Sequence, residues 1–311
     1  MSKESKPFLI PKDGDVFITQ ILERCDDLIY SGIWEGLDTI RLHTWMKNFK
    51  TPPECYFAAC LLDALIYRSD EQTAAMMRQL FQRCIPDILR LAPPRFTTET
   101  DWYQQLKLPI HVKDPHIRIV PVIKPTDPPT KSGLLVCRFY RRLLKLNQAF
   151  MIWPWQIDFA KTIGVNAFLF VDDFLGTGDQ FSRFMTHFSI NDKLVNTDAI
   201  YAPLVAHEKG INDLRKSYPE LRICAVERLS EKYNLFAEDS LCFQDQNNIN
   251  TPLSAYEFYD NLIKDRNLPI SSFKNGYGNF AIAYGFEHAT PDNCLPIFWI
   301  QNENWQPLLE R

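Results

Sequence analysis

From about residue 110 onward, short apolar runs alternate with helical patterns, and this alternation constrains the fold more than any other feature. Strands that alternate with helices form βαβ units, in which parallel strands are covered by helices. Strands are expected at 117–123, 167–171, 200–206, 221–226 and 280–286. Helices are expected at 134–146, after Gly178, at 208–217 and at 254–264. The sequence therefore predicts an α/β fold with a parallel twisted sheet.

The chain before about residue 91 has helical periodicity throughout. Thr51-Pro52-Pro53-Glu54 is a strong helix start, because it combines a threonine cap, prolines in the first turn and a glutamate at the capping-box position. Further helices are expected at 16–33, at 37–49 and from Asp70 onward. We therefore expect a helical accessory domain at 1–100, for which a winged-helix-like form is left open, and a sheet domain at 101–311.

Composition and charge narrow the class of protein. Of the 311 residues, 46% are hydrophobic, which is enough to supply a buried core, and a net charge of −4 disfavours a nucleic-acid footprint along the whole chain. The first residues lack the apolar stretch and cleavage site of a secretory signal, and the longest apolar run, which contains Asp63, is too short to span a bilayer. Eight cysteines form no CxxC pair, so we expect free thiols in a soluble, cytoplasmic protein without membrane contacts.

The segment FLFVDDFLGTGDQF carries the most chemical information. Its apolar strand ends in Asp172 and Asp173, and a Gly-Thr-Gly turn then opens a helix. Open α/β sheets bind ligands at the carboxyl ends of their strands, and backbone N–H groups at a helix N-terminus attract anions. We expect the two aspartates to accept hydrogen bonds from ribose hydroxyls. The following residues are expected to hold a phosphate: Leu175, Gly176, Thr177, Gly178, Asp179 and Gln180.

Other interpretations of this segment are weaker. An apolar strand that ends in two aspartates also describes a Walker-B strand, but no GxxxxGK[ST] segment is present to hold nucleotide phosphates. A dinucleotide fingerprint requires a third glycine, which the Gly176-Thr177-Gly178 turn lacks. A purely structural strand-to-helix turn with an aspartate cap stays open.

The segment resembles the phosphoribosyl-pyrophosphate motif of type I phosphoribosyltransferases, and the resemblance covers about residues 110 to 311. The C-terminal string GYGNFAIAYGFEHATPDNCLPIFW, with His288, Pro291, Asn293 and Pro296, resembles a divergent branch that is associated with bacterial conflict (anti-phage) systems. The resemblance implies the type I fold and a site for a 5-phosphoribosyl group. It also implies that the helical N-terminal part is an accessory module, and it names no acceptor substrate.

Two further groups of residues gain a role from this resemblance. The 124–133 loop falls where the family binds the leaving pyrophosphate, and Lys131 with the N–H groups of Ser132 and Gly133 suits a diphosphate. The alternative is a proline-rich surface connection with a serine cap. His288 is a candidate for acceptor contact or proton transfer, because its reference pKa lies near neutrality. A structural, hydrogen-bonded histidine is the alternative.

Basic residues recur along one face of the helix expected at 134–146. Arg138, Arg141, Arg142 and Lys145 follow an i, i+3, i+4, i+7 spacing, so they share a face that could meet a nucleic acid, a polyphosphate or an acidic partner from a defence system. A solvated helix face is the alternative. The expected apolar face comprises Leu135, Phe139, Leu143 and Leu146.

These observations lead to one functional hypothesis and two alternatives. The hypothesis is an effector enzyme of anti-phage defence that binds phosphoribosyl pyrophosphate with Mg²⁺ and transfers the phosphoribosyl group to an unidentified acceptor. Asp172 and Asp173 would meet the metal only indirectly, through the hydroxyls of the ligand. The alternatives are a catalytically silent sensor of phosphoribosyl ligands and a component that binds nucleic acid or a protein partner. The oligomeric state is left open.

Overall fold

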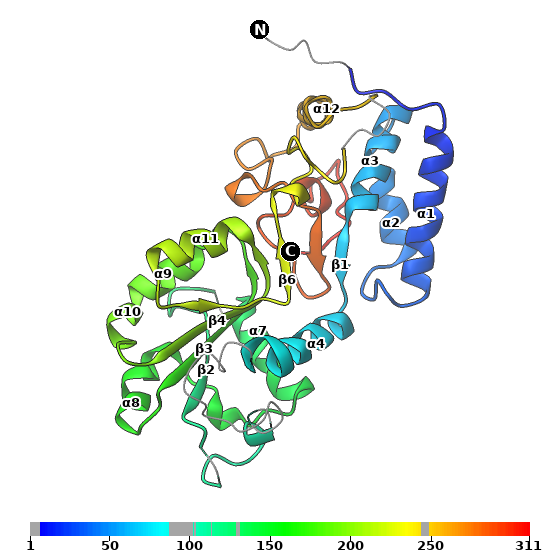
Figure 1. Cartoon of the computed structure of the whole chain (residues 1–311). Helices are drawn as coiled ribbons and strands as arrows, with labels where there is room; N and C mark the ends of the chain where they lie inside the picture. The colour runs from blue at the N-terminus through cyan, green and yellow to red at the C-terminus, as the bar shows by residue number, and fades with distance from the viewer. Residues whose placement is uncertain (1–6, 87–101, 103, 113, 129–130, 244–248) are drawn as a thin grey trace. The chain divides into compact units, whose positions relative to one another are not determined.

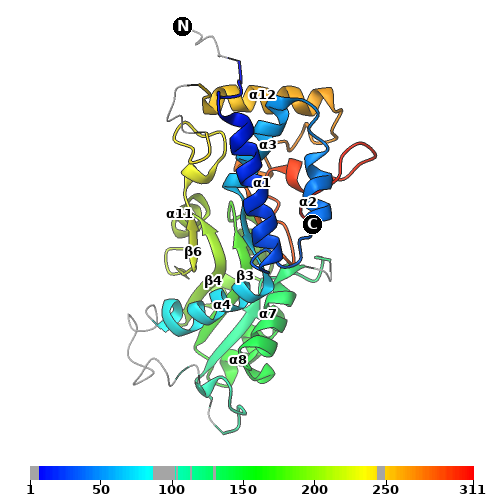
Figure 2. The same cartoon turned by 90° about the vertical axis from the view of Figure 1, so that its right-hand side faces the viewer.

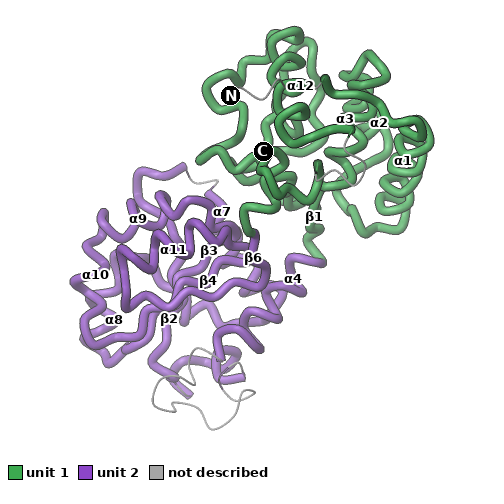
Figure 3. Tube along the Cα trace, turned by 45° about the horizontal axis from the view of Figure 1, so that its top comes forward, with its two compact units in different colours: residues 1–71, 230–311 green, residues 72–229 purple. Residues whose placement is uncertain are grey.

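The chain divides into two compact units, which Figure 3 colours separately. The structure is a computed structural model and describes residues 7–86, 102, 104–112, 114–128, 131–243 and 249–311. Unit 1 combines Met1–Glu71 with Ser230–Arg311, and unit 2 comprises Gln72–Leu229. The domain boundary predicted near residue 100 lies outside the described residues.

Unit 1 is mainly helical, and its helices come from both ends of the chain. Its regular elements are α1 (Gly14–Tyr30), α2 (Thr39–Met46), α3 (Pro52–Ala64), β1 (Ile66–Arg68), α12 (Pro252–Asp265) and β7 (Tyr284–Phe286). Short 3₁₀ turns occur at Glu231–Tyr233, Tyr277–Asn279 and Pro296–Phe298. Helix α1 packs against α3, and in Figure 2 α1 lies in front of α3. The helices predicted in the first 70 residues are thus confirmed to within a few positions.

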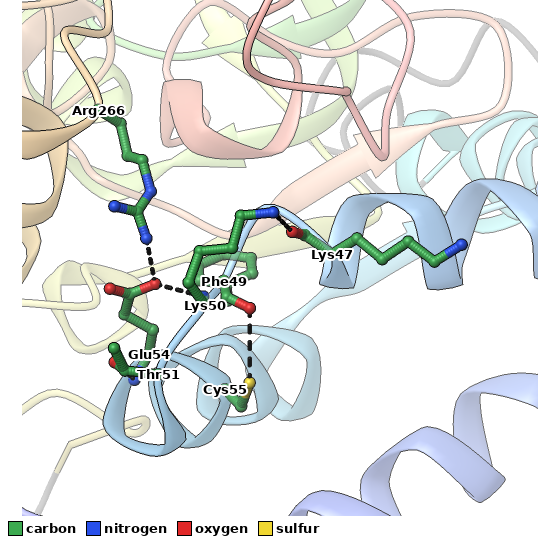
Figure 4. A network of polar contacts seen from close by, with 7 residues as sticks. All are labelled: Lys47, Phe49, Lys50, Thr51, Glu54, Cys55 and Arg266. Atoms are coloured by element: carbon green, nitrogen blue, oxygen red, sulfur yellow. Dashed lines mark hydrogen bonds and ion pairs between the residues drawn. The ribbon is translucent and has the colours of Figure 1, made fainter.

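The start of α3 has the predicted threonine cap, but Glu54 bonds to the backbone of Lys50, one residue before the N-cap position that a capping box requires. The Thr51 side chain accepts a hydrogen bond from the Glu54 backbone N–H at 3.4 Å. The Glu54 carboxylate accepts in turn from the Lys50 backbone N–H at 2.5 Å and from the Arg266 guanidinium at 2.6 Å (Figure 4). Since Arg266 caps the C-terminus of α12, this carboxylate joins the N-terminal helices to the C-terminal segment.

One continuous core fills unit 1. Trp45 from α2 is fully buried, stacks on Phe298 with ring centroids 5.6 Å apart, and donates to the Ile297 carbonyl at 3.0 Å. Strand β1 pairs in parallel with β7, so that Ile66 lies opposite Tyr284. The strand predicted at 280–286 is therefore shorter than expected, and it joins this two-stranded sheet rather than the large sheet.

Unit 2 contains the predicted parallel sheet. Its strands are β2 (Ile117–Pro121), β3 (Ala167–Leu175), β4 (Asp198–His207), β5 (Arg222–Ile223) and β6 (Glu227–Leu229). They follow the order β2-β3-β4-β5, and β6 also pairs with β4. All of these pairs are parallel, and β3 and β4 are buried along almost their whole length. The α/β fold class predicted from the alternating pattern is confirmed.

Helices cover both faces of this sheet (Figure 1). Helix α7 packs against β2 and β3, whereas α8, α9 and α11 share a hydrophobic core with Phe168 and Phe170 of β3. Among the described residues of unit 2, the structure gives bounds for α4 (Asp70–Gln79, which begins in unit 1), a π-helical turn (Leu80–Cys84), α7 (Ser132–Leu143), α8 (Ile157–Thr162), α9 (Asp179–His187), α10 (Ile190–Lys193) and α11 (Glu208–Ser217). Short 3₁₀ turns occur at Gln148–Phe150 and Pro154–Gln156. None of the helices in the described ranges is both long and apolar enough to cross a bilayer.

Two strand boundaries differ from the sequence prediction in ways that affect the site. The strand expected at 167–171 continues to Leu175, because β4 extends beside it and pairs with it as far as Ala206. The acidic pair consequently lies within the strand rather than in the loop after it. The strand expected at 221–226 is limited to β5, and β6 begins beyond it at Glu227; both strands pair with β4.

Candidate functional site

The acidic pair lies at the carboxyl end of β3, where open α/β sheets place their ligands. Asp172 is 1% exposed and Asp173 is 7% exposed, so both carboxyl groups are removed from bulk water. The Phe174 backbone N–H donates to the Asp173 carboxylate at 2.8 Å. The pair was expected after the strand; it lies instead within β3, buried and shortly before the Gly176–Gly178 turn.

The Gly176–Gly178 turn connects β3 to the nine-residue helix α9. Gly178 is the N-cap residue, and its φ of 88° lies in the left-handed region that favours glycine. The Thr177 hydroxyl accepts from the Asp179 backbone N–H at 3.3 Å, and no side chain caps the helix from the Gly178 position. A helix N-terminus leaves its first backbone N–H groups without partners inside the helix, which makes this turn a candidate anion site.

Gly210 of α11, which the sequence analysis missed, makes this turn possible. A Cβ atom at Gly210 in α11 would lie 2.0 Å from the carbonyl oxygen of Gly176, which no real contact allows. A glycine inside an otherwise helical pattern is unusual, because it weakens the helix. That anomaly at Gly210 was the available signal that another backbone passes close to α11.

The carboxyl group of Asp172 is the centre of a hydrogen-bond network. The Gln180 amide donates to it at 3.1 Å, the Tyr201 hydroxyl at 3.4 Å and the Ser132 hydroxyl at 3.5 Å. The Asp173 backbone N–H donates at 3.1 Å. The network therefore brings the starts of α7 and α9 to one buried side chain. Tyr201 was not predicted, since a tyrosine in an apolar strand gives no signal of its polar contact.

This environment favours the neutral form of Asp172. Burial raises the pKa of its carboxyl group well above the usual range, and the neighbouring Asp173 charge raises it further. Hydrogen bonding to the Asp173 backbone and the positive charge of Lys131 oppose the rise but do not cancel it.

The start of α7 forms the second part of the site. Lys131 is the N-cap residue without a side-chain cap bond, and Ser132 is the first helical residue. The alternative interpretation of Ser132 as a helix cap is therefore wrong, because its hydroxyl bonds to Asp172 instead. A Cβ at Gly133 would lie 3.2 Å from the carbonyl oxygen of Val122, so glycine lets the helix start pack against the chain that follows β2. Pro129 and Thr130 of the predicted loop lie outside the described residues.

His288 lies in unit 1, not in the unit that contains the acidic pair. Its side chain is 5% exposed, stacks on Phe286 with centroids 4.9 Å apart, and has its Nδ1 atom 3.7 Å from the Asp70 carboxylate. These contacts are all within unit 1, and the role predicted for His288 in acceptor contact or proton transfer stays a prediction.

Arg138, Arg141 and Arg142 are exposed on α7 as expected, whereas Lys145, although exposed, lies beyond the end of the helix at Leu143 and has a φ of 59°, so it does not continue the helical face. The apolar face differs from the prediction, because Leu143 is 39% exposed and Leu135 is only partly buried. The prediction holds at Phe139 and Leu146, which are buried, and the other buried side chains of this segment are Val136, Cys137, Tyr140 and Leu144. Binding of a partner by the basic face stays a prediction.

The donors around the acidic pair limit how a metal ion could be held. Among the residues that the structure describes, no group of three His, Cys, Asp or Glu side chains could form a metal site. Mg²⁺ commonly binds through one or two carboxylates together with substrate phosphates and water, rather than in an all-protein site. The indirect role expected for Asp172 and Asp173, through the hydroxyls of a ligand, stays a prediction.

The comparison with known families agrees with this geometry. The family model described as PRTase-CE matches residues 42–311, which includes the sheet, the acidic pair, the glycine turn and the C-terminal segment of unit 1. No curated protein matches the chain. Since the match covers most of the sequence, the chain belongs to the PRTase-CE family of phosphoribosyltransferase-like proteins.

Proposed function

We propose that this protein binds phosphoribosyl pyrophosphate together with Mg²⁺ and transfers the phosphoribosyl group to an acceptor. The observation that supports this most strongly is the meeting of two helix starts at the acidic pair, through Ser132 of α7 and Gln180 of α9. A ligand with a phosphate at one end, a diphosphate at the other and a ribose between them matches this arrangement. The family membership supports the same class of ligand.

The 5-phosphate is assigned to the turn from Leu175 to Gln180. The N–H groups at the start of α9 and the positive end of the helix dipole favour an anion there. The Thr177 side chain and the left-handed Gly178 lie in the same turn, so the backbone can approach the phosphate closely. The phosphate would anchor the sugar beside the acidic pair.

Within the acidic pair, the ribose hydroxyls are assigned to Asp173 rather than to Asp172. The carboxyl oxygens of Asp172 already accept hydrogen bonds from several neighbours, as described above. Cleavage of the bond between the ribose and its leaving group places positive charge on the sugar ring. A carboxylate held nearby in a water-poor site stabilises that charge.

The leaving pyrophosphate is assigned to the start of α7. Lys131 is partly buried and contributes positive charge, while the N–H groups of Ser132 and Gly133 open the helix. Bound Mg²⁺ would supply neutralising charge to the diphosphate oxygens. The residues of the chain then orient the diphosphate, hold the ribose and limit the access of water.

A catalytically silent sensor is the second candidate, and the burial of Asp172 favours it. A carboxyl group that is 1% exposed and has a raised pKa is less suited to stabilising a cationic sugar than an ionised one. Such a protein would keep the phosphoribosyl pocket and release no pyrophosphate. Its response would be a conformational or partner-binding change.

One experiment separates the two candidates. The protein is titrated with phosphoribosyl pyrophosphate and Mg²⁺ in a calorimeter, and pyrophosphate release is then followed with candidate nucleobases, nucleosides and water as acceptors. Binding with release supports the transferase, and binding without release supports the sensor. A lack of binding would contradict both, and the exposed face of α7 would become the leading candidate for a binding surface.

The proposal extends to a role as an effector in anti-phage defence, which the C-terminal resemblance suggests. Cells that carry the gene together with its neighbouring genes should resist phage infection in a plaque assay. The Asp173→Asn variant should lose that resistance at equal protein levels. Equal protection by both forms would contradict a role for phosphoribosyl chemistry in defence.

A further inference from the structure

The carboxyl group of Asp172 lies between two helix starts that the proposed function assigns to different parts of one ligand. One oxygen accepts from the Gln180 amide, which belongs to the first turn of α9, and from Tyr201 on β4. The other accepts from Ser132, the first residue of α7, and from the backbone N–H of Asp173. A single side chain therefore bonds to α7, α9 and β4.

Contact between Asp172 and its neighbours leaves little capacity for a ligand. An ionised carboxylate has about four acceptor positions and a protonated carboxyl group has fewer, so the four donors around Asp172 already fill its accepting capacity. The side chain is also almost completely buried. A direct hydrogen bond to a ribose hydroxyl would require one of these donors to leave.

We infer that Asp172 is a positioning residue, which fixes the spacing between the starts of α7 and α9 so that both ends of a phosphoribosyl pyrophosphate molecule can bind at once. This inference rests on the proposed function. A ligand that engages two sites gains affinity only when their separation matches its length. Loss of the Asp172 contacts should therefore weaken a ligand that spans both sites more than a ligand that fills one.

The test compares three ligands on the wild type and on Asp172→Ala by calorimetry: phosphoribosyl pyrophosphate, ribose 5-phosphate and inorganic pyrophosphate, each with Mg²⁺. We expect the variant to lose at least about tenfold in affinity for phosphoribosyl pyrophosphate and to stay within about twofold for the two fragments. An equal loss for ribose 5-phosphate would overturn the inference, because it would indicate direct contact with the sugar.

A smaller change guards against a folding defect. Tyr201→Phe removes one donor to the Asp172 carboxyl but keeps the ring, which stacks on Phe181 with centroids 3.9 Å apart. This variant should show the same selective loss to a smaller extent. An unchanged preference for the two-ended ligand in Tyr201→Phe and also in Gln180→Ala would contradict a positioning role.

Hydrogen exchange gives a result that does not depend on the ligand. In Asp172→Ala, exchange should rise at the first turns of both α7 and α9, whereas α11, which His207 caps from the same sheet edge, serves as the control. A rise confined to β3, or equal in all three helices, would overturn the inference. Absence of any phosphoribosyl pyrophosphate binding by the wild type would refute the proposed function instead, and the exchange result would still decide whether Asp172 positions the helices.

Discussion

The two units of this protein are assembled from the chain in different ways. In unit 2, consecutive strand–helix pairs build the sheet and also supply the acidic pair, the glycine turn and the start of α7. In unit 1, segments from both ends of the chain share one core, in which Trp45 stacks on Phe298. Neighbouring segments carry a local sequence pattern for their structure, whereas contacts between the two ends of a chain carry none.

The largest expected effect concerns the shared core of unit 1. Trp45→Ala removes a fully buried ring and its hydrogen bond to the Ile297 carbonyl, which should lower the free energy of unfolding by about 3–5 kcal/mol. Chemical denaturation measures this loss. Trp155→Ala is the matched control, because Trp155 of unit 2 is 49% exposed and should change stability by less than about 1 kcal/mol. Similar losses in both variants would contradict the described core.

The next effect concerns close backbone packing in unit 2. Gly210→Ala places a methyl group against the Gly176 carbonyl, so it should cost about 1–3 kcal/mol and weaken phosphoribosyl pyrophosphate binding. Gly32→Ala is the control in unit 1, since Gly32 has a φ of 74° but open space around it, and only the conformational cost of about 1 kcal/mol applies. Unchanged ligand binding by Gly210→Ala would show that α11 does not shape the turn.

The buried acid of unit 2 predicts a pH dependence. Because the pKa of Asp172 is raised in the folded state, the folded protein retains a proton that the unfolded chain releases as the pH rises above about 4. Stability should therefore fall with rising pH, by up to about 1.4 kcal/mol per pH unit while the two states differ by one proton. Urea denaturation at a series of pH values between about pH 5 and about pH 8 measures how the free energy of unfolding changes with pH. In Asp172→Asn, the fall that Asp172 causes should disappear. Parallel slopes for both proteins would mean that Asp172 ionises normally.

The smallest effect on stability is expected at the exposed face of α7. Replacement of Arg141 and Arg142 by glutamate should change the free energy of unfolding by no more than about 0.5 kcal/mol.

If the face binds a nucleic acid through four cations, the association constant should fall with salt, with a slope of log K against log salt of about −3.6 on duplex DNA, from about −0.9 for each contact. Gel shifts across a salt series with DNA and RNA measure this slope. Arg215→Glu with Lys216→Glu on α11 makes the same charge change elsewhere, and equal loss in both variants would indicate a non-specific effect.

The sequence predicted what depends on local pattern. The Thr51 cap, the strand before Asp172 and the glycine turn each have a signature within a few residues, and all three are present. The pairing of Ile66 with Tyr284 could not be predicted, because no local pattern specifies which distant strand a short apolar run will join. The burial of Asp172 was also missed, since it depends on Tyr201 from another strand and on the start of α7. The exposure of Leu143 was misjudged, although Phe139 and Leu146 are buried as predicted.

The central claim is that the turn from Leu175 to Gln180 holds the 5-phosphate of a phosphoribosyl ligand. A crystal structure of the protein with phosphoribosyl pyrophosphate and Mg²⁺ tests it most directly. The account predicts that the 5-phosphate lies on the backbone N–H groups of Gly176 to Gln180, with Asp173 at the ribose, and that Gly178→Val crystals soaked in the same ligand lack it. A 5-phosphate bound elsewhere in the wild type, or still seated in this turn in Gly178→Val, would contradict the account.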